Sequence, residues 1–175
     1  RRRLKEREAY YRRYTEAMPQ MAFIADAAGN IIYYNQRWYD YIGRDRRTAG
    51  WGWQTEQVHH PADLDRTVRR WQSSLRSGRP YEIEYRLRRA DGEYRWHLGR
   101  AIPFKDPDGQ IIYWLGTNTD IHQQKLTEEA LKQSEERFKA AFAHAGVGVA
   151  VTDAAGSYVF VNKAYQKLTG YTQAE

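Results

Sequence analysis

The most constraining feature of this sequence is a repeat, in which residues 25–43 recur in the same register as residues 152–170. The first segment reads ADAAGNIIYYNQRWYDYIG and the second reads TDAAGSYVFVNKAYQKLTG. Six residues are identical in the two segments: Asp26/Asp153, Ala27/Ala154, Ala28/Ala155, Gly29/Gly156, Asn35/Asn162 and Gly43/Gly170. Because solenoid units run at roughly 20 to 50 residues, a repeat at this longer distance predicts a tandem of whole domains.

The repeat also sets the expected domain boundaries. The match extends upstream through Leu4/Leu131, Lys5/Lys132, Glu8/Glu135 and Tyr11/Phe138, so the helical segment before each copy belongs to the repeating unit. We therefore expect a flanking helix at 1–17, a complete domain at 18–122, a coiled-coil-like linker helix at 123–145 and the N-terminal fragment of a second domain at 146–175. Such a fragment supplies little more than a hairpin, and it is expected to pack on a neighbour or to fray.

Composition excludes several classes of protein. The chain has 14 Tyr and 6 Trp, enough for aromatic rings to line a core or a cavity. It has no cysteine, which excludes a disulfide framework, a thiolate metal site and a cysteinyl cofactor adduct, and which fits a reducing compartment. No run of about 18 apolar residues occurs, so we expect a cytoplasmic segment without direct membrane contact, although an anchor upstream of Arg1 is compatible with this sequence.

The net charge of +6 is unevenly distributed. Residues 1–17 contain seven Lys or Arg and three Glu, so +4 of the +6 lies in one helix. The remainder is nearly balanced. A basic helix end is more typical of a solvated helix or a coiled-coil flank than of a nucleic-acid surface, and we therefore expect no nucleic-acid partner.

Hydrophobic spacing predicts the elements of the first half. The first element is a helix that ends at Pro19, and its apolar stripe is Leu4, Tyr11, Tyr14 and Met18. Two short strands, 22–25 and 31–34, are joined by a glycine turn, and short helices follow over 36–49, broken at Gly43. Residues 50–57 are expected to form a loop or a single helical turn. A helix then begins at Pro61 and ends at Gly78, and its expected buried face is Leu64, Val68, Trp71 and Leu75.

The second half changes to a period of two residues. From residue 81 onward, apolar side chains alternate with charged ones, which is the pattern of a strand with one buried face. The residues of that face are Tyr81, Ile83, Tyr85 and Leu87. Asp91-Gly92 and Asp108-Gly109 predict turns into two more strands, 94–104 and 111–118. The fold class is therefore α+β, a five-stranded antiparallel sheet with helices inserted between strands 2 and 3. In the linker helix, an apolar seam with a period of about seven is suited to aligning two subunits: Leu131, Ser134, Phe138, Ala141 and Ala145.

Several phrases within residues 18–122 resemble the PAS/PAC sensory module family of bacterial signalling proteins. They are MPQMAFIADAAGNIIYYNQRWYDYIG, GWGW followed by HHPADLDR, YEIEYRLRRADGEYRWHLGRAIPF, and WLGTNTDIHQQK. The last is similar to the G-x-x-x-D-I close of that family, from Gly116 through Asp120 to Ile121. The resemblance implies a five-stranded sheet whose helices enclose a pocket, which binds a small ligand or is simply core.

The resemblance also implies a mode of action. In such proteins the flanking helices form homodimer contacts and pass a signal to a downstream output domain in the same chain. For this chain we expect the output domain of a two-component sensor histidine kinase, with a diguanylate cyclase, a phosphodiesterase or a transcription regulator as alternatives. The residues expected to relay the signal here are Asp120, Ile121, Leu131 and Phe138.

The expected pocket residues are aromatic side chains suited to stacking on a planar ligand and two polar side chains suited to orienting it: Tyr34, Trp38, Trp53, Tyr85, Trp114, Asn118 and Arg100. The alternative is that these rings fill the core. Asn35 and Asn162 precede helical segments in both copies, which favours a turn or capping role. Arg86 and Arg88 lie beside glutamates on a strand face expected to be solvated or to pack on a flanking helix.

Cofactor and catalytic chemistry find little support in the sequence. A cluster of His59, His60, Asp63 and Asp65 is compatible with a metal site, but a proline follows His60 and acidic residues favour a helix N-terminus, so capping is the preferred interpretation. His97 is compatible with haem ligation, yet it does not match the usual position, and a flavin adduct would need a cysteine. We therefore predict no cofactor, leave a small ligand open and expect no enzyme within this segment. A haem or flavin redox or gas sensor and a metal-dependent enzyme using His59, His60 and Asp63 are the alternatives.

Overall fold

The computed structural model describes residues 12–47 and 57–170 of the chain. It divides into two compact units, Arg1–Gln123 and Gln124–Glu175, which are treated separately below. The expected stripe at Leu4 and Tyr11 and the expected loop at 50–56 lie outside the described residues. Tyr14, from the same stripe, is 55% exposed.

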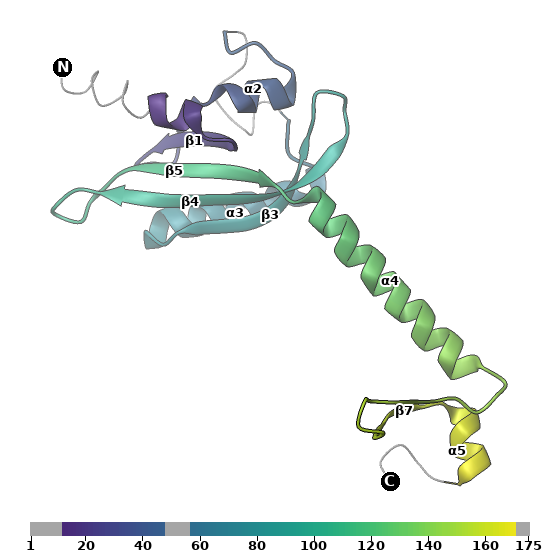
Figure 1. Cartoon of the computed structure of the whole chain (residues 1–175). Helices are drawn as coiled ribbons and strands as arrows, with labels where there is room; N and C mark the ends of the chain where they lie inside the picture. The colour runs from purple at the N-terminus through teal and green to yellow at the C-terminus, as the bar shows by residue number, and fades with distance from the viewer. Residues whose placement is uncertain (1–11, 48–56, 171–175) are drawn as a thin grey trace, which may run out of the picture. The chain divides into compact units, whose positions relative to one another are not determined.

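The first unit is built on a five-stranded antiparallel sheet (Figure 1). Its strands are β1 (Met21–Asp26), β2 (Ile31–Tyr34), β3 (Tyr81–Arg88), β4 (Tyr94–Lys105) and β5 (Ile111–Asp120). They are ordered β2-β1-β5-β4-β3, so the last strand pairs with the first in the middle of the sheet. The predicted α+β class, with helices between the second and third strands, is confirmed.

Tight turns join the strands where the sequence predicted them. In the β1–β2 turn, Gly29 adopts a φ of 92° and its N–H donates to the carbonyl oxygen of Asp26 at 3.0 Å. The Asp26 carboxylate accepts from both the backbone and the side-chain nitrogen of Asn30. Because only glycine adopts such a positive φ without strain, the glycine and the aspartate together specify this hairpin.

Two helices follow the first hairpin. Helix α2 (Gln36–Ile42) ends at Gly43, and α3 (Pro61–Ser77) ends at Gly78, both of which have left-handed backbones. Helix α3 starts as predicted, because Pro61 occupies its first turn and the side chain of His60 accepts from the Ala62 N–H at 3.2 Å. A further helical segment, residues 12–17, precedes β1 and is called the N-terminal helix below.

The buried face of α3 differs from the predicted one. Its buried residues are Asp63, Thr67, Trp71 and Ser74, whereas Leu64, Val68 and Leu75 are only half-buried. Three of the four buried side chains are polar and hydrogen-bonded: Asp63 to Arg86, Thr67 to the Asp63 carbonyl and Ser74 to Arg70. Satisfied polar groups can therefore occupy the face turned to the sheet, which hydrophobic spacing alone does not reveal.

The core between α3 and the sheet is mostly aromatic. Trp71 contacts Tyr81 and Trp114 edge-on, with ring centroids 5.1 and 5.2 Å apart. Trp114 and Leu87 are fully buried. This arrangement uses the edge-to-face geometry that aromatic pairs prefer, so the tryptophans on one helix and one strand join the two layers.

The second unit contains most of α4 (His122–His144), then β6 (Ala150–Thr152), β7 (Tyr158–Val161) and α5 (Lys163–Thr169). The two strands form an antiparallel hairpin, as the repeat predicts. Among residues 124–170, Val161 and Asn162 are buried, while several large apolar side chains are exposed: Val147, Tyr158, Val159 and Leu168. Packing on a neighbour or fraying stays a prediction for this fragment.

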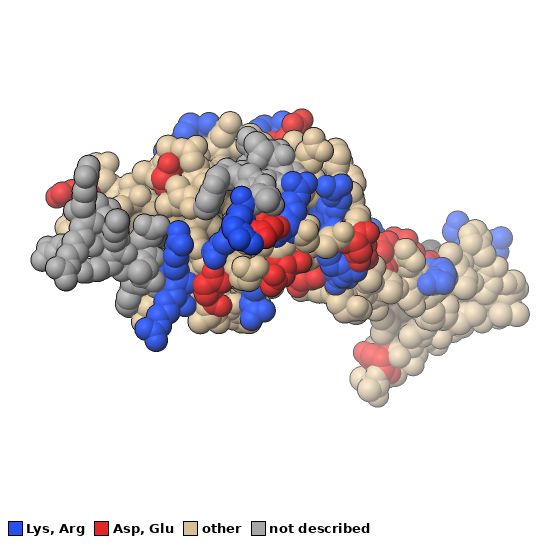
Figure 2. All heavy atoms as spheres, turned by 90° about the horizontal axis from the view of Figure 1, so that it is seen from above, with Lys and Arg blue, Asp and Glu red and all other residues tan. Residues whose placement is uncertain are grey.

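The surface carries charges of both signs. On the face shown in Figure 2, basic and acidic side chains of the described residues lie interspersed. In the part of the chain that the structure describes, no helix has the length and apolar character needed to cross a membrane.

Candidate functional site: an interior pocket and two helix junctions

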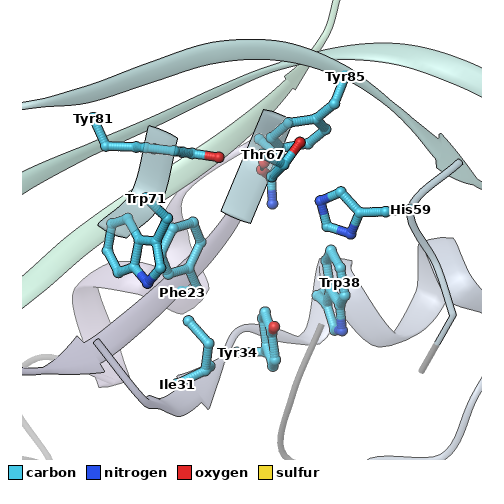
Figure 3. A pocket seen from close by; sticks show the side chains of 10 residues that line it. Phe23, Ile31, Tyr34, Trp38, His59, Thr67, Trp71, Tyr81 and Tyr85 are labelled. Carbon is cyan, nitrogen blue, oxygen red and sulfur yellow. Dashed lines mark hydrogen bonds between the residues drawn. The ribbon is translucent and has the colours of Figure 1, made fainter. Parts of the chain in front are cut away.

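A small hollow lies between α3, the first hairpin with α2, and the inner face of the sheet (Figure 3). Its volume is about 30 Å³. Ten side chains line it: Phe23, Ile31, Tyr34, Trp38, His59, Thr67, Trp71, Tyr81, Tyr85 and Asn118. None of them carries a formal charge at neutral pH while His59 is unprotonated, so this lining suits an uncharged ligand.

One side of the pocket is aromatic. The rings of Tyr34, from β2, and Trp38, from α2, stack with centroids 4.4 Å apart and planes 8° apart. Phe23 contacts both Tyr34 and Trp71 at centroid distances of 6.4 Å. The sequence brings them together because Phe23 and Tyr34 are register partners in the β1–β2 hairpin and Trp38 lies one turn into the following helix.

The other side is polar. The Tyr85 hydroxyl donates to the side-chain oxygen of Asn118, and burial raises the pKa of Tyr85. The His59 ring lies 4.6 Å from the ring of Tyr85. Burial lowers the pKa of His59 to about 4, with His97 adding to this effect and Asp63 opposing it. His59 is therefore neutral at physiological pH.

The structure brings four of the seven expected pocket residues to this hollow: Tyr34, Trp38, Tyr85 and Asn118. Trp114 is buried behind Trp71 and does not line the pocket, and Trp53 lies outside the described residues. Arg100 requires a correction. Its neighbours Gly99 and Ala101 are buried, so strand alternation turns Arg100 outward, where its Nε is 2.7 Å from a Glu82 carboxylate oxygen.

Sequence reasoning missed several lining residues, among them Phe23, Thr67, Trp71 and Tyr81. Tyr81 and Trp71 were expected on buried faces, and adding the alternation of β3 to the helical spacing of α3 would have placed both on this hollow. Thr67 carried no such indication, because it is polar.

The pocket residues do not fit a haem or a flavin. A hollow of about 30 Å³ holds one or two water molecules, whereas small-molecule sites run from about 300 Å³ upward. His97, considered above as a haem ligand, packs its ring at 5.0 Å from that of Tyr41, and its Nδ1 is 2.9 Å from the Arg95 carbonyl oxygen.

The residues considered for a metal site have other partners. Arg86 donates to both carboxylate oxygens of Asp63, from Nε at 2.8 Å and from a terminal nitrogen at 3.0 Å. Burial raises the pKa of Asp63, but the hydrogen bonds from Arg86 outweigh it and lower the pKa to about 2. Arg86 therefore ties β3 to α3, rather than being solvated or packing on a flanking helix as expected. Within residues 12–47 and 57–170, no three His, Cys, Asp or Glu side chains form a metal-binding group.

The junction between β5 and α4 is bonded to β4. Asp120 accepts from the His122 N–H at 2.8 Å and from Arg95 Nε at 2.9 Å. The Ile121 N–H donates to the carbonyl oxygen of Trp96 at 2.9 Å. Two of the four expected relay residues therefore attach the start of α4 to the sheet. The other two, Leu131 and Phe138, are 61% and 59% exposed along α4.

A second junction holds the N-terminal helix. The fully buried side chain of Asn35 donates to the carbonyl oxygens of Thr15 at 3.0 Å and Gln20 at 2.8 Å. Its oxygen accepts from the Ala22 N–H at 2.9 Å. Asn35 makes no side-chain capping bond to α2, so the capping alternative is wrong for this residue. Its carbonyl oxygen accepts from the Trp38 N–H at 3.1 Å, which agrees with the turn alternative.

The second copy has the same three hydrogen bonds at the equivalent positions. Asn162 donates to the carbonyl oxygens of Phe142 at 3.0 Å and Val147 at 2.9 Å and accepts from the Val149 N–H at 2.9 Å. It also caps α5 by accepting from the Tyr165 N–H, which confirms the expected role here. The sequence indicated this shared joint through the identity of the two asparagines and through the repeat of the helical segment before each copy.

Comparisons with known proteins agree with this fold. A family model described as PAS fold matches residues 31–118, and one described as PAS domain matches residues 136–175. A crystal structure of a sensory box histidine kinase/response regulator from Burkholderia thailandensis superposes with a TM-score of 0.55 at 20% identity, over 77% of this chain and 98% of that one. At that identity the likeness shows the fold alone.

Two relatives are more similar in sequence. Protein y4lL of Sinorhizobium fredii is 35% identical over 165 residues, which are 93% of this chain and 20% of that protein. The peroxide stress-activated histidine kinase mak1 of Schizosaccharomyces pombe is 35% identical over 136 residues, 73% of this chain and 8% of that protein. The chain thus spans one fifth or less of the length of these relatives.

Proposed function

Because the chain belongs to the PAS domain family, we propose that it is a sensory module that dimerises and relays the state of its pocket through its flanking helices to an output domain. The observation that carries this proposal is the junction of β5 with α4. Asp120 and Ile121 bond the start of the helix to the sheet, so a change in the sheet reaches the helix directly. The pocket and the surface of α4 support the other two parts of the proposal, ligand sensing and dimerisation.

The pocket supports sensing only of an uncharged molecule about as large as the one or two water molecules that its volume of about 30 Å³ holds. Its lining joins the first hairpin, α3 and the sheet, so a molecule that binds there contacts all three. Binding shifts a conformational equilibrium only if the molecule contacts the two states differently. Asn118, which accepts a hydrogen bond from Tyr85 in the pocket, lies on β5 two residues before Asp120, so one strand connects the pocket with the start of α4.

The surface of α4 supports dimerisation. Along its 23 residues no side chain is buried, and the exposed seam includes Leu131 and Phe138. A helix with an unpartnered apolar seam at a period of seven gains stability by pairing with a second copy of itself. We therefore propose that two copies pair along this seam.

The output domain is proposed by analogy with the relatives. One relative is named a histidine kinase, which favours a two-component kinase in the same chain. A diguanylate cyclase, a phosphodiesterase or a transcription regulator would use the same module. We propose no catalytic activity, nucleic-acid partner or direct membrane contact for this segment, and we place it in the cytoplasm, as the absence of cysteine favours. Incubating the full-length protein separately with ATP and GTP would distinguish a phosphorylated histidine from a cyclic dinucleotide product.

Light scattering after gel filtration tests whether two copies pair along the seam of α4. The wild-type chain of 20.7 kDa is expected to elute as a dimer, and Leu131→Glu combined with Phe138→Glu is expected to give a monomer. Lys139→Glu, an exposed change on the same helix, is the matched control and should remain dimeric. A wild-type chain that is monomeric at high concentration would overturn the proposal.

A further inference from the structure

The N-terminal helix is held by a second group of contacts, next to the asparagine joint. They converge on Glu16. The Tyr33 hydroxyl donates to one carboxylate oxygen at 2.5 Å, the Gln36 N–H donates to the other at 2.9 Å, and Arg46 donates to the first at 3.0 Å. Burial would raise the pKa of Glu16, but these hydrogen bonds outweigh it and lower the pKa. The carboxylate is therefore charged and bound on three sides.

Arg46 completes this group. Its guanidinium lies over the rings of Tyr33 and Tyr39, at 5.1 and 5.5 Å from their centroids, and donates to the Tyr34 carbonyl oxygen at 2.8 Å. The side chains of Arg46 and Glu16 are each 35% exposed. Water and salt therefore reach this ion pair, unlike the bonds of Asn35.

The second copy keeps the asparagine and lacks the charged group. In the register of the repeat, Ala143 stands in place of Glu16 and Phe160 in place of Tyr33. Phe142, on the preceding helix, instead contacts Phe160 with ring centroids 5.6 Å apart. The first joint is thus reinforced by charge and the second by apolar contact.

We propose that Glu16, Tyr33 and Arg46 form an electrostatic latch that releases the N-terminal helix when the ion pair is screened or outcompeted, whereas the equivalent joint at Asn162 stays closed. Salt weakens exposed ion pairs and does not weaken apolar contacts, so raising the salt concentration should loosen the first joint and leave the second unchanged. The role of the latch in signalling rests on the proposed relay, because the N-terminal helix would then be the flanking helix that detaches from the first domain. Its contacts stand independently of that relay.

The absence of native cysteine allows a clean test with a single spin label. The label is attached at Arg13→Cys on the exposed side of the N-terminal helix, or at Ala140→Cys, the equivalent position before the second copy. Salt is raised from about 0.1 to about 1 M NaCl, which shortens the Debye length from about 10 to about 3 Å. We expect the mobile fraction of the label at position 13 to rise about two- to fivefold, the range that one exposed ion pair supplies, and that at position 140 to stay constant.

Variants separate the latch from a general effect of salt. Glu16→Gln keeps the shape of the side chain but removes its charge, so the label at position 13 should be mobile already at low salt and insensitive to more. Arg46→Gln should behave alike, and it replaces Glu16→Gln if that variant does not fold by circular dichroism. Glu82→Gln, which removes the exposed partner of Arg100, is the matched control and should behave as the wild type.

A label at position 13 that stays immobile in Glu16→Gln and Arg46→Gln, or that ignores salt in the wild type, overturns the latch. Light scattering measures dimerisation on the same samples, and a change in label mobility is assigned to the latch only where the oligomeric state is the same at both salt concentrations. A monomeric protein whose label at position 13 becomes mobile at high salt would contradict the proposed relay and support the latch. A dimeric protein whose label stays immobile would support the dimer that the relay requires and contradict the latch.

Discussion

At the scale of single residues, His59 is expected to make stability depend on pH. Its pKa is lowered from 6.5 to about 4 by burial in the pocket wall. A lowered folded-state pKa means that the stabilisation is complete above the unfolded value of 6.5 and is lost as the pH falls towards 4. The free energy of unfolding should therefore decrease by roughly 3 kcal/mol across that window.

Urea titrations between pH 7 and pH 4 measure this effect. His59→Gln cannot be protonated, so its free energy of unfolding should fall less steeply over the same window. Burial also lowers the pKa of His97, which should leave a residual slope in that variant. An identical slope in the wild type and in His59→Gln would contradict the assignment.

Individual residues also show what a sequence can and cannot reveal about the site. Tyr34 and Trp38 were predictable because a strand and the helix directly after it place them on the same side. Arg100 was misplaced because its role was taken from its residue type, without applying the strand alternation that turns it to solvent. The pairing of Arg86 with Asp63 joins residues 23 positions apart, and no local pattern specifies such a contact.

At the scale of elements, that same pair is expected to fix α3 against β3. Asp63→Asn leaves the Arg86 guanidinium partly buried without its counter-ion. Removing one partner of a buried ion pair costs 3 kcal/mol or more, and the 29% exposure of Arg86 reduces the cost here to about 2 kcal/mol. Chemical denaturation of the variant measures this loss.

The control for this prediction lies on the same turn of α3. Asp65→Asn removes the same charge near the helix N-terminus, but Asp65 is exposed, so its effect should stay below about 0.5 kcal/mol. Equal losses in both variants would show that the helix dipole, and not the contact with Arg86, accounts for the stabilisation.

The elements themselves were largely predictable, and the reason is physical. Strands and turns are set by local alternation and by glycines that need a positive φ, both of which are written in the sequence. The order of the strands and the buried face of α3 depend on distant partners. A helix that buries Asp63, Thr67 and Ser74 against a sheet satisfies rules of hydrogen bonding that a hydrophobic pattern does not record.

At the scale of the whole molecule, the two units are expected to differ in stability. The first has an extensive aromatic core, whereas residues 124–170, the described part of the second, bury little beyond Val161 and Asn162. A lone hairpin with a short helix is marginal in water. Amide exchange followed by mass spectrometry should therefore show the β6–β7 hairpin exchanging much faster than the β4–β5 pair, and equal protection of the two would contradict this expectation.

The asparagine joints have a consequence for how such domains are combined. All three bonds of Asn35 reach backbone atoms, and so do the three equivalent bonds of Asn162. The residues that supply those atoms differ between the copies, Thr15, Gln20 and Ala22 in one and Phe142, Val147 and Val149 in the other. The asparagine therefore recognises the backbone that precedes the domain and does not select the side chains of these residues, provided that the backbone groups lie within hydrogen-bonding distance. A domain with this asparagine can therefore follow helices of different sequence, and the side-chain contacts of each helix then decide how firmly it is held.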